Sequence, residues 1–160
     1  ANLPYYPQLV EKLVAIEPSH ALLNLSKKKQ HSFNGKFESI LSSAERTPLE
    51  KNSFDFIVCT FTLCSVPNTM SVLQEVRRLM RPRGKFLFLE HGLAPDKKIQ
   101  TWQKRLTPIQ KCIAGGCHLD RNILGLLADA CCDVGEIKRF YVEGIPKPFG
   151  FVSLGQGEFY

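Results

Sequence analysis

The sequence predicts an α/β protein with a largely parallel sheet, and three observations carry this prediction. Short apolar runs alternate along the chain with stretches in which apolar residues recur every three or four positions, as in buried strands and amphipathic helices. Polar residues follow the apolar runs, at the edge where a parallel sheet binds its ligands. The 160 residues suffice for one globular core. We therefore expect a single domain over residues 1–160.

The first half of the chain supplies the expected parallel strands. Residues 12–16 form a short apolar run that ends in a glutamate and a proline, and proline forbids further strand pairing. Residues 20–32 carry leucines followed by three lysines, which favours a helix with cations near its C-terminal end. Further strands are predicted at residues 36–41 and 54–60. The run at 54–60 is nearly all apolar after its aspartate, which indicates a central position.

The second half continues with helices and two closing strands. Residues 69–81 have helical spacing and must stop at Pro82, and Gly84 provides a turn before a strand at residues 85–90. Two helical patterns follow, and the last two strand candidates are close enough in sequence to pair in an antiparallel manner. These remaining elements are predicted at residues 95–116, 119–131, 136–142 and 149–154.

Composition and charge exclude several classes of protein. Hydrophobic residues make up 44% and charged residues 22% of the chain, which is typical of a globular domain and not of a disordered one. No apolar run reaches the roughly 20 residues that cross a bilayer, so we expect a cytoplasmic protein or one at a membrane surface. The net charge is +6, but the basic runs lack the interleaved aromatic residues of a single-strand binder, so nucleic acid is not an expected partner.

The six cysteines are predicted to be free thiols. They form no C-x-x-C pair and no regular disulfide framework. Cys112, Cys117 and His118 are crowded together but do not have the spacing of zinc ligands. We therefore expect no bound metal.

Polar or small residues collect at the ends of the predicted strands. Glu17, Ser43, Ala44, Thr60 and His91 all lie at or just after such an end. Packing of a core does not require polar side chains there, whereas ligands of α/β sheets bind at this edge. For any one of these residues taken alone, ordinary loop polarity is the better explanation.

One block of sequence carries a family resemblance. Residues 52–66 (NSFDFIVCTFTLCSV) and 73–90 (LQEVRRLMRPRGKFLFLE) resemble the class I S-adenosylmethionine-dependent methyltransferases, in the small-molecule group that includes the ubiquinone and menaquinone methyltransferases. Arg83 stands where that family has the first glycine of L-R-P-G-G. The FTLCSV run and residues 115–121 (GGCHLDR) are also similar to methyltransferase-like proteins of the endoplasmic reticulum and lipid droplets, some of which methylate thiols.

The resemblance implies a Rossmann-like sheet with helices on both faces and an antiparallel C-terminal strand pair. In the family, the sheet opens with a central strand that ends in G-x-G-x-G, whose glycines let the backbone approach the cofactor. The sequence is expected to begin just after this loop, and the sheet therefore to lack its first central strand, between those at residues 12–16 and 54–60.

The resemblance also implies a cofactor, S-adenosylmethionine, and a set of residues that bind it. Glu17 would accept both ribose hydroxyls, as carboxylates do in dinucleotide folds, and the remaining residues would surround adenine or pass beneath the methionine part. Ser43 stands where the family often has an aspartate. The other members of the implied set are Pro18 and Ser19, Ala44 and Glu45 in the adenine loop, and Thr60 and Phe61 below the methionine part.

The implied acceptor side of the site lacks an obvious general base. Cys64 and Ser65 occupy the place where many relatives carry two histidines, and they are expected to face the substrate. A methyl group on a sulfonium is already activated, so alignment of the two reactants supplies much of the catalysis. His91 and His118 are the candidates for proton removal, because histidine changes charge near physiological pH. A structural role is the alternative for either histidine.

A basic amphipathic segment over residues 96–113 is expected at the acceptor entrance. Pro108 is predicted to divide it into two shorter helices. In one interpretation its apolar side forms a lid that packs on the sheet. In the other, Trp102 and the lysines contact an anionic membrane surface through which an apolar acceptor enters.

The expected function is methyl transfer from S-adenosylmethionine to a small apolar acceptor, such as a thiol, phenol, lipid or quinone precursor. The alternative is a truncated, catalytically inactive methyltransferase-like module that binds a partner. The sequence identifies neither the acceptor atom nor the oligomeric state.

Overall fold

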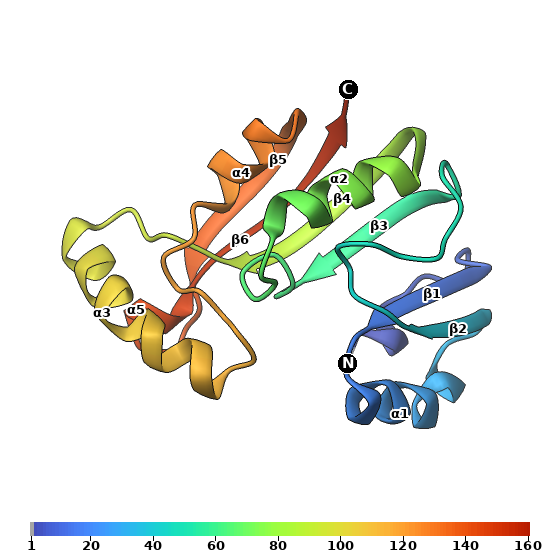
Figure 1. Cartoon of the computed structure of the whole chain (residues 1–160), viewed down its shortest axis with the longest axis horizontal. Coiled ribbons are helices and arrows are strands. Elements are labelled where there is room, and N and C mark those ends of the chain that lie inside the picture. Colours follow the sequence, from blue (N-terminus) through green and yellow to red (C-terminus); the bar gives the residue numbers. More distant parts are fainter. Residues whose placement is uncertain (1) are drawn as a thin grey trace. The chain divides into compact units, whose positions relative to one another are not determined.

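The computed structural model describes residues 2–160. The chain forms two compact units, Ala1–Pro48 and Leu49–Tyr160, and each is an α/β arrangement (Figure 1). The first contains a two-stranded sheet and the second a four-stranded sheet. None of the helices within residues 2–160 combines the length and the apolar character that a membrane span requires.

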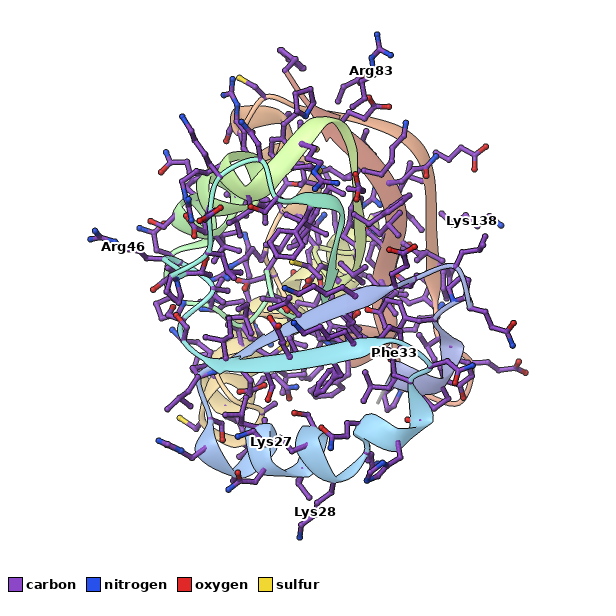
Figure 2. The ribbon with its side chains drawn as sticks, turned by 90° about the vertical axis from the view of Figure 1, so that its right-hand side faces the viewer. Lys27, Lys28, Phe33, Arg46, Arg83 and Lys138 are labelled. Carbon is purple, nitrogen blue, oxygen red and sulfur yellow. The ribbon has the colours of Figure 1, made fainter. Side chains whose placement is uncertain are left out.

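The first unit pairs two parallel strands beside one α-helix. Its strands align without a shift, so that Glu17 at the end of β1 lies opposite Leu41 at the end of β2. The helix α1 ends in lysines, and the charged end of Lys28 points away from the strands (Figure 2). The elements are η1 (Leu3–Tyr5), β1 (Lys12–Glu17), α1 (His20–Lys28), η2 (Gln30–Ser32) and β2 (Lys36–Leu41).

The second unit has a mixed sheet in the order β3-β4-β6-β5. The pair β3 and β4 is parallel, whereas β6 is antiparallel to both β4 and β5, as expected for the closing strands. Helices α2 and α4 lie over one face of this sheet (Figure 1). Its elements are β3 (Phe54–Thr60), α2 (Thr69–Leu79), β4 (Met80–His91), α3 (Lys97–Ile113), α4 (Ile123–Asp129), β5 (Cys132–Tyr141), α5 (Lys147–Gly150) and β6 (Phe151–Phe159).

Strand β3 lies at an edge of the described sheet and not at its centre. It pairs with β4 on one side, and Phe56 is 62% exposed. Within residues 2–160, no strand joins the two-stranded sheet to the four-stranded one.

Strand β4 shows why one face of the sheet is buried. Phe86, Phe88 and Glu90 alternate with half-buried residues, and each of the three is at most 1% exposed. Two of these positions are aromatic, as the period of a strand with one core face requires. The third is a carboxylate, which needs polar partners at that depth.

Several predicted boundaries were wrong. Helix α2 ends at Leu79, two residues before the predicted end, because Met80 already pairs with Phe54. The pairing is then interrupted before Lys85, where Arg83 adopts a left-handed backbone with φ of 64° next to Gly84. Helix α3 continues through Pro108 as one helix of 17 residues, so the expected division into two pieces does not occur.

Candidate functional site

The carboxyl edge of the two-stranded sheet gathers the residues predicted to surround adenosine. Glu17 closes β1 and is half-buried, and its Oε1 accepts a hydrogen bond of 2.9 Å from the backbone N–H of Ser19. Ser19 in turn is the N-cap of α1, where its hydroxyl accepts from the Leu22 N–H at 3.4 Å. The strand end and the helix start therefore fix the direction of the carboxylate.

The predicted adenine loop follows the neighbouring strand. Residues Ser43 to Glu45 come directly after β2, whose last residue is aligned with Glu17. The Ser43 hydroxyl accepts from the Glu45 N–H at 3.2 Å and lies 3.3 Å from Glu45 Oε2. This turn directs the Ser43 hydroxyl onto the loop itself, and the half-buried Ala44 lies between the two partners.

In the second unit, the predicted residues Thr60 and Phe61 lie where β3 ends. Phe61 adopts a left-handed backbone with φ of 52° and donates its N–H to Leu89 O at 2.9 Å. Its ring packs on that of His91, with centroids 4.7 Å apart. A bulky residue at positive φ marks a strained turn, and this one redirects the chain into the segment of Cys64.

Glu90 organises this turn, and sequence reasoning did not select it. Its Oε1 accepts from the N–H groups of Thr62 and Leu63, both at 2.9 Å, and its Oε2 accepts from Cys64 N at 3.1 Å. Burial raises the pKa of the Glu90 carboxyl to about 8, the nearby Cys64 adds to the rise, and the three amides oppose it. The sequence did contain a signal for Glu90, because this carboxylate follows Phe86 and Phe88 at alternate positions of a predicted strand.

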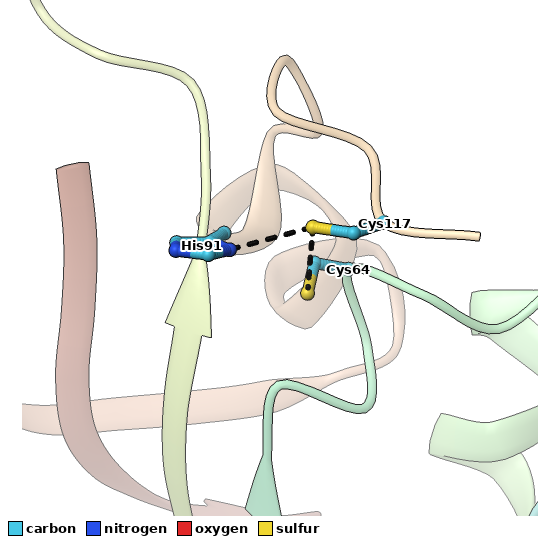
Figure 3. Close-up of side chains that lie close together, drawn as sticks. All are labelled: Cys64, His91 and Cys117. Atoms are coloured by element: carbon cyan, nitrogen blue, oxygen red, sulfur yellow. Dashed lines mark hydrogen bonds between the residues drawn. The ribbon is translucent and has the colours of Figure 1, made fainter. Parts of the chain in front are cut away.

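Cys64, His91 and Cys117 meet at the end of this sheet (Figure 3). The two sulfurs are 3.7 Å apart, and His91 Nδ1 lies 3.4 Å from Cys117 Sγ. The hydrogen bond between the thiols raises the pKa of Cys64 to about 12, with burial adding to it, and lowers the pKa of Cys117 to about 7. Sequence reasoning selected Cys64 and His91 separately and missed Cys117, which is 53 residues from Cys64.

His118 and Arg121 also hold the loop that contains Cys64 (residues 61–66, the Cys64 loop). The His118 N–H donates to Cys64 O at 2.8 Å. The Arg121 guanidinium donates to Leu63 O, to Val66 O and to the hydroxyl of Thr69. Burial and then the charge of Arg121 lower the pKa of the His118 imidazole, which favours its neutral form.

The segment that carries Trp102 buries polar rather than apolar side chains. Gln103 and Thr107 face the interior of the unit, whereas Trp102, Ile109 and Ile113 are 53%, 60% and 75% exposed. The expectation that the apolar side of this helix packs on the sheet is therefore wrong for these three residues. The Arg105 guanidinium lies 5.9 Å from the centroid of the Trp102 ring.

A hollow of about 570 Å³ opens near the starts of α2 and α4. Its lining includes Pro67, Thr69, Arg121 and Leu126. It contains none of the residues predicted from the sequence to bind cofactor or acceptor. Arg121 and Thr69 both link this hollow to the Cys64 loop, since each donates a hydrogen bond to Leu63 O.

Comparison with known proteins gives a family and several relatives. The family model described as "Methyltransferase domain" matches residues 1–88. A thiol S-methyltransferase, TMT1B of Rattus norvegicus, is 30% identical over 159 residues, covering 97% of this chain and 63% of its own length. A demethylmenaquinone methyltransferase of Oceanobacillus iheyensis is 32% identical over 80 residues, covering 49% of this chain and 34% of its own length.

Solved structures agree with these matches at the level of the fold. A crystal structure of a SAM-dependent methyltransferase from Methanosarcina mazei superposes with a TM-score of 0.74, covering 92% of this chain and 82% of that chain at 18% identity. The chain spans less than two thirds of the length of the rat relative.

Proposed function

Because this chain belongs to the methyltransferase domain family, we propose that it transfers a methyl group from S-adenosylmethionine to a small apolar acceptor. The observation that carries the proposal is Glu17, a carboxylate held at the end of a parallel strand by the backbone of the helix that follows. A carboxylate in this position suits the two hydroxyls of a ribose.

The residues of the first unit fit the adenosine part of the cofactor. Glu17 is half-buried, so this residue is partly protected from water. The Ser43 to Glu45 turn offers backbone groups at the end of the adjacent strand, and Pro18 and Ser19 would lie along the adenine. A peptide backbone can both donate to and accept from a base edge.

The residues of the second unit fit the remaining roles. Thr60 and Phe61 are proposed to contact the methionine part, and Cys64 and Ser65 to face the acceptor. The bound cofactor supplies an electrophilic methyl on a sulfonium, so the protein has to align the acceptor atom and remove its proton. His118, whose pKa is lowered by burial, is a suitable neutral acceptor for that proton. His91 is the second candidate.

We infer that the acceptor is a thiol. The relative named a thiol S-methyltransferase matches 97% of this chain, whereas the demethylmenaquinone methyltransferase matches 49%. A thiol loses its proton near pH 8.5 and a phenol near pH 10. A site with one neutral histidine therefore deprotonates a thiol more readily.

The exposed side of α3 suits peripheral contact with a membrane, where apolar thiols concentrate. We propose that Trp102 lies at the acceptor entrance on this side. Lipid surfaces of the endoplasmic reticulum or of lipid droplets are the proposed location, in keeping with the basic residues that surround Trp102.

The first prediction concerns Glu17. Glu17→Ala should weaken S-adenosylmethionine binding about 100-fold, or about 2.7 kcal/mol, because two charge-assisted hydrogen bonds are lost. Isothermal calorimetry measures the affinity. The matched control is Glu11→Ala, which removes an exposed carboxylate just before the opposite end of the same strand and should leave binding unchanged.

Transfer is measured with radiolabelled cofactor and a matched pair of acceptors, an aryl thiol and the corresponding phenol. Methylation of the thiol is the expected result. Equal binding by the Glu17→Ala and Glu11→Ala variants contradicts the ribose assignment. Cofactor binding without transfer to either acceptor contradicts the enzymatic function and favours the inactive binding module.

A further inference from the structure

Three potential metal ligands from distant parts of the second unit meet at one point. Cys64 follows β3, His91 closes β4 and Cys117 follows α3, and one ligand atom of each lies within 4.8 Å of the others (Figure 3). From this geometry we propose that Cys64, His91 and Cys117 form a zinc site. The inference does not depend on methyl transfer.

The distances match those of a tetrahedral zinc centre. Bond lengths of about 2.3 Å for Zn–S and about 2.0 Å for Zn–N place two sulfurs about 3.8 Å apart and a sulfur about 3.5 Å from a nitrogen. The observed separations are 3.7 Å between the sulfurs and 3.4 Å between Cys117 Sγ and His91 Nδ1. Two of the three ligand pairs are thus at their metal-bound spacing, and the third pair, Cys64 with His91, lies within 4.8 Å.

Surrounding contacts hold each ligand in place. Glu90 accepts the Cys64 N–H, and His118 donates to the Cys64 carbonyl. The His91 ring packs on Phe61, and its backbone pairs with Val152 of β6. Ligands supported in this way need little rearrangement to bind a metal.

The chemistry of the ligands favours zinc over a disulfide. Two thiolates and an imidazole are a common zinc ligand set, and three protein ligands leave a fourth position for water or another small ligand. Both thiols lose their protons to solvent as they bind, so the two thiolates balance the charge of Zn²⁺. A disulfide would require the sulfurs to approach to about 2.05 Å and would leave the imidazole without a role.

Zinc at this point changes the assignment of His91. Its Nδ1 would hold the metal, so that nitrogen could not take a proton from an acceptor, and the Cys64 sulfur would bind zinc instead of facing the acceptor. His118, whose backbone N–H donates to the Cys64 carbonyl, would remain the candidate for proton removal.

In the test, the reduced, metal-free protein is titrated with Zn²⁺ alone, and calorimetry measures the binding. Elemental analysis of the dialysed protein then gives the zinc content. We expect one zinc ion per chain. Cys64→Ala and Cys117→Ala should each weaken binding at least about 100-fold, and His91→Ala about 10-fold or more. The matched controls are Cys112→Ala and His31→Ala, which replace exposed residues of the same types and should bind as the unaltered protein does.

Substitution with Co²⁺ gives a second measurement that needs no variant. Thiolate-to-cobalt charge-transfer absorption with the intensity of two thiolates, together with the strong visible bands of a tetrahedral ion, is expected. Absence of stoichiometric zinc, retained affinity in both cysteine variants, a cobalt spectrum without thiolate absorption, or a Cys64–Cys117 disulfide that persists in reductant would each overturn the site. Methyl transfer is not part of either readout, so the zinc site and the proposed function can fail separately.

Discussion

A single buried carboxylate determines how the residues around Cys64 are ordered. Glu90 lies on the face of β4 that also buries Phe86 and Phe88, and it replaces an apolar core contact by three hydrogen bonds to backbone N–H groups. The sequence pattern places Glu90 on that face because side chains of a strand alternate. Its hydrogen-bond partners lie in the loop after β3, far away in sequence, so no local pattern reveals them.

The second prediction follows from these hydrogen bonds. Glu90→Ala leaves three buried N–H donors without acceptors and should lower the free energy of unfolding by about 3 kcal/mol or more. Glu90→Gln retains a carbonyl oxygen for two of the donors and should cost less. Urea denaturation measures both, with the exposed Glu136→Ala as control. Equal stability of Glu90→Ala and Glu136→Ala contradicts a structural role for the carboxylate.

The same limitation explains the partial prediction of the site. Glu17, Thr60 and His91 could be selected because the ends of parallel strands can be read from apolar runs, and Cys64 because of its place in the family resemblance. Cys117 could not, because it lies in a turn after α3, where it approaches residues 26 and 53 positions away. A search of the sequence for metal ligands at short spacing therefore pairs Cys117 with Cys112 and His118, and not with Cys64 and His91.

At the scale of elements, strands were predicted better than helix ends. The strands at residues 36–41 and 54–60 have the predicted bounds, since polar residues, glycine or proline flank each apolar run. The end of α2 was predicted two residues too late because Met80 pairs with Phe54. That pairing is a tertiary interaction that overrides helical spacing.

Helix α3 shows a second kind of error, in which the amphipathic pattern was recognised but the wrong face was expected to be buried. The apolar stripe through Trp102, Ile109 and Ile113 is present, and it faces solvent. Gln103 fills the buried side, where it donates to Gly92 O and accepts from Ala94 N, both at 3.0 Å. An amphipathic pattern identifies two faces, but it does not say which one the domain covers.

The third prediction tests contact of this stripe with lipid. The protein should float with anionic vesicles, and Trp102→Ala should reduce flotation because an interfacial aromatic is lost. Lys98→Ala should reduce binding about fivefold on anionic vesicles and leave neutral vesicles unaffected, since a cation near the surface contributes about 1 kcal/mol. Thr101→Ala on the same helix is the control. Failure of the unaltered protein to float contradicts membrane contact.

At the scale of the whole molecule, the two units differ in how their strands are supported. Strand β4 has hydrogen-bonded neighbours on both sides, whereas β1 and β2 have one described neighbour each. A two-stranded sheet is marginally stable by itself and depends on the helix that packs against it. The predicted adenine loop follows β2 and is thus attached to the less supported sheet.

The fourth prediction concerns hydrogen exchange across the chain. Amides of β4 and β6 should exchange most slowly, and those of β1 and β2 faster, because opening a two-stranded sheet breaks fewer contacts. Addition of S-adenosylmethionine should slow exchange near Glu17 and Ser43. Exchange in β1 as slow as in β4, without added cofactor, contradicts this difference between the units.

The two-sided fixing of the Cys64 loop also has a consequence for how the protein folds. Glu90 reaches the loop across 26 to 28 residues, and Arg121 reaches it across 55 to 58. Contacts between residues so far apart in sequence form only after the intervening chain has closed into a loop, and loop closure costs entropy. The loop therefore acquires its shape late, when β4 and the segment before α4 are already in place. Until those segments have paired, Cys64, His91 and Cys117 remain apart and cannot bind a metal together.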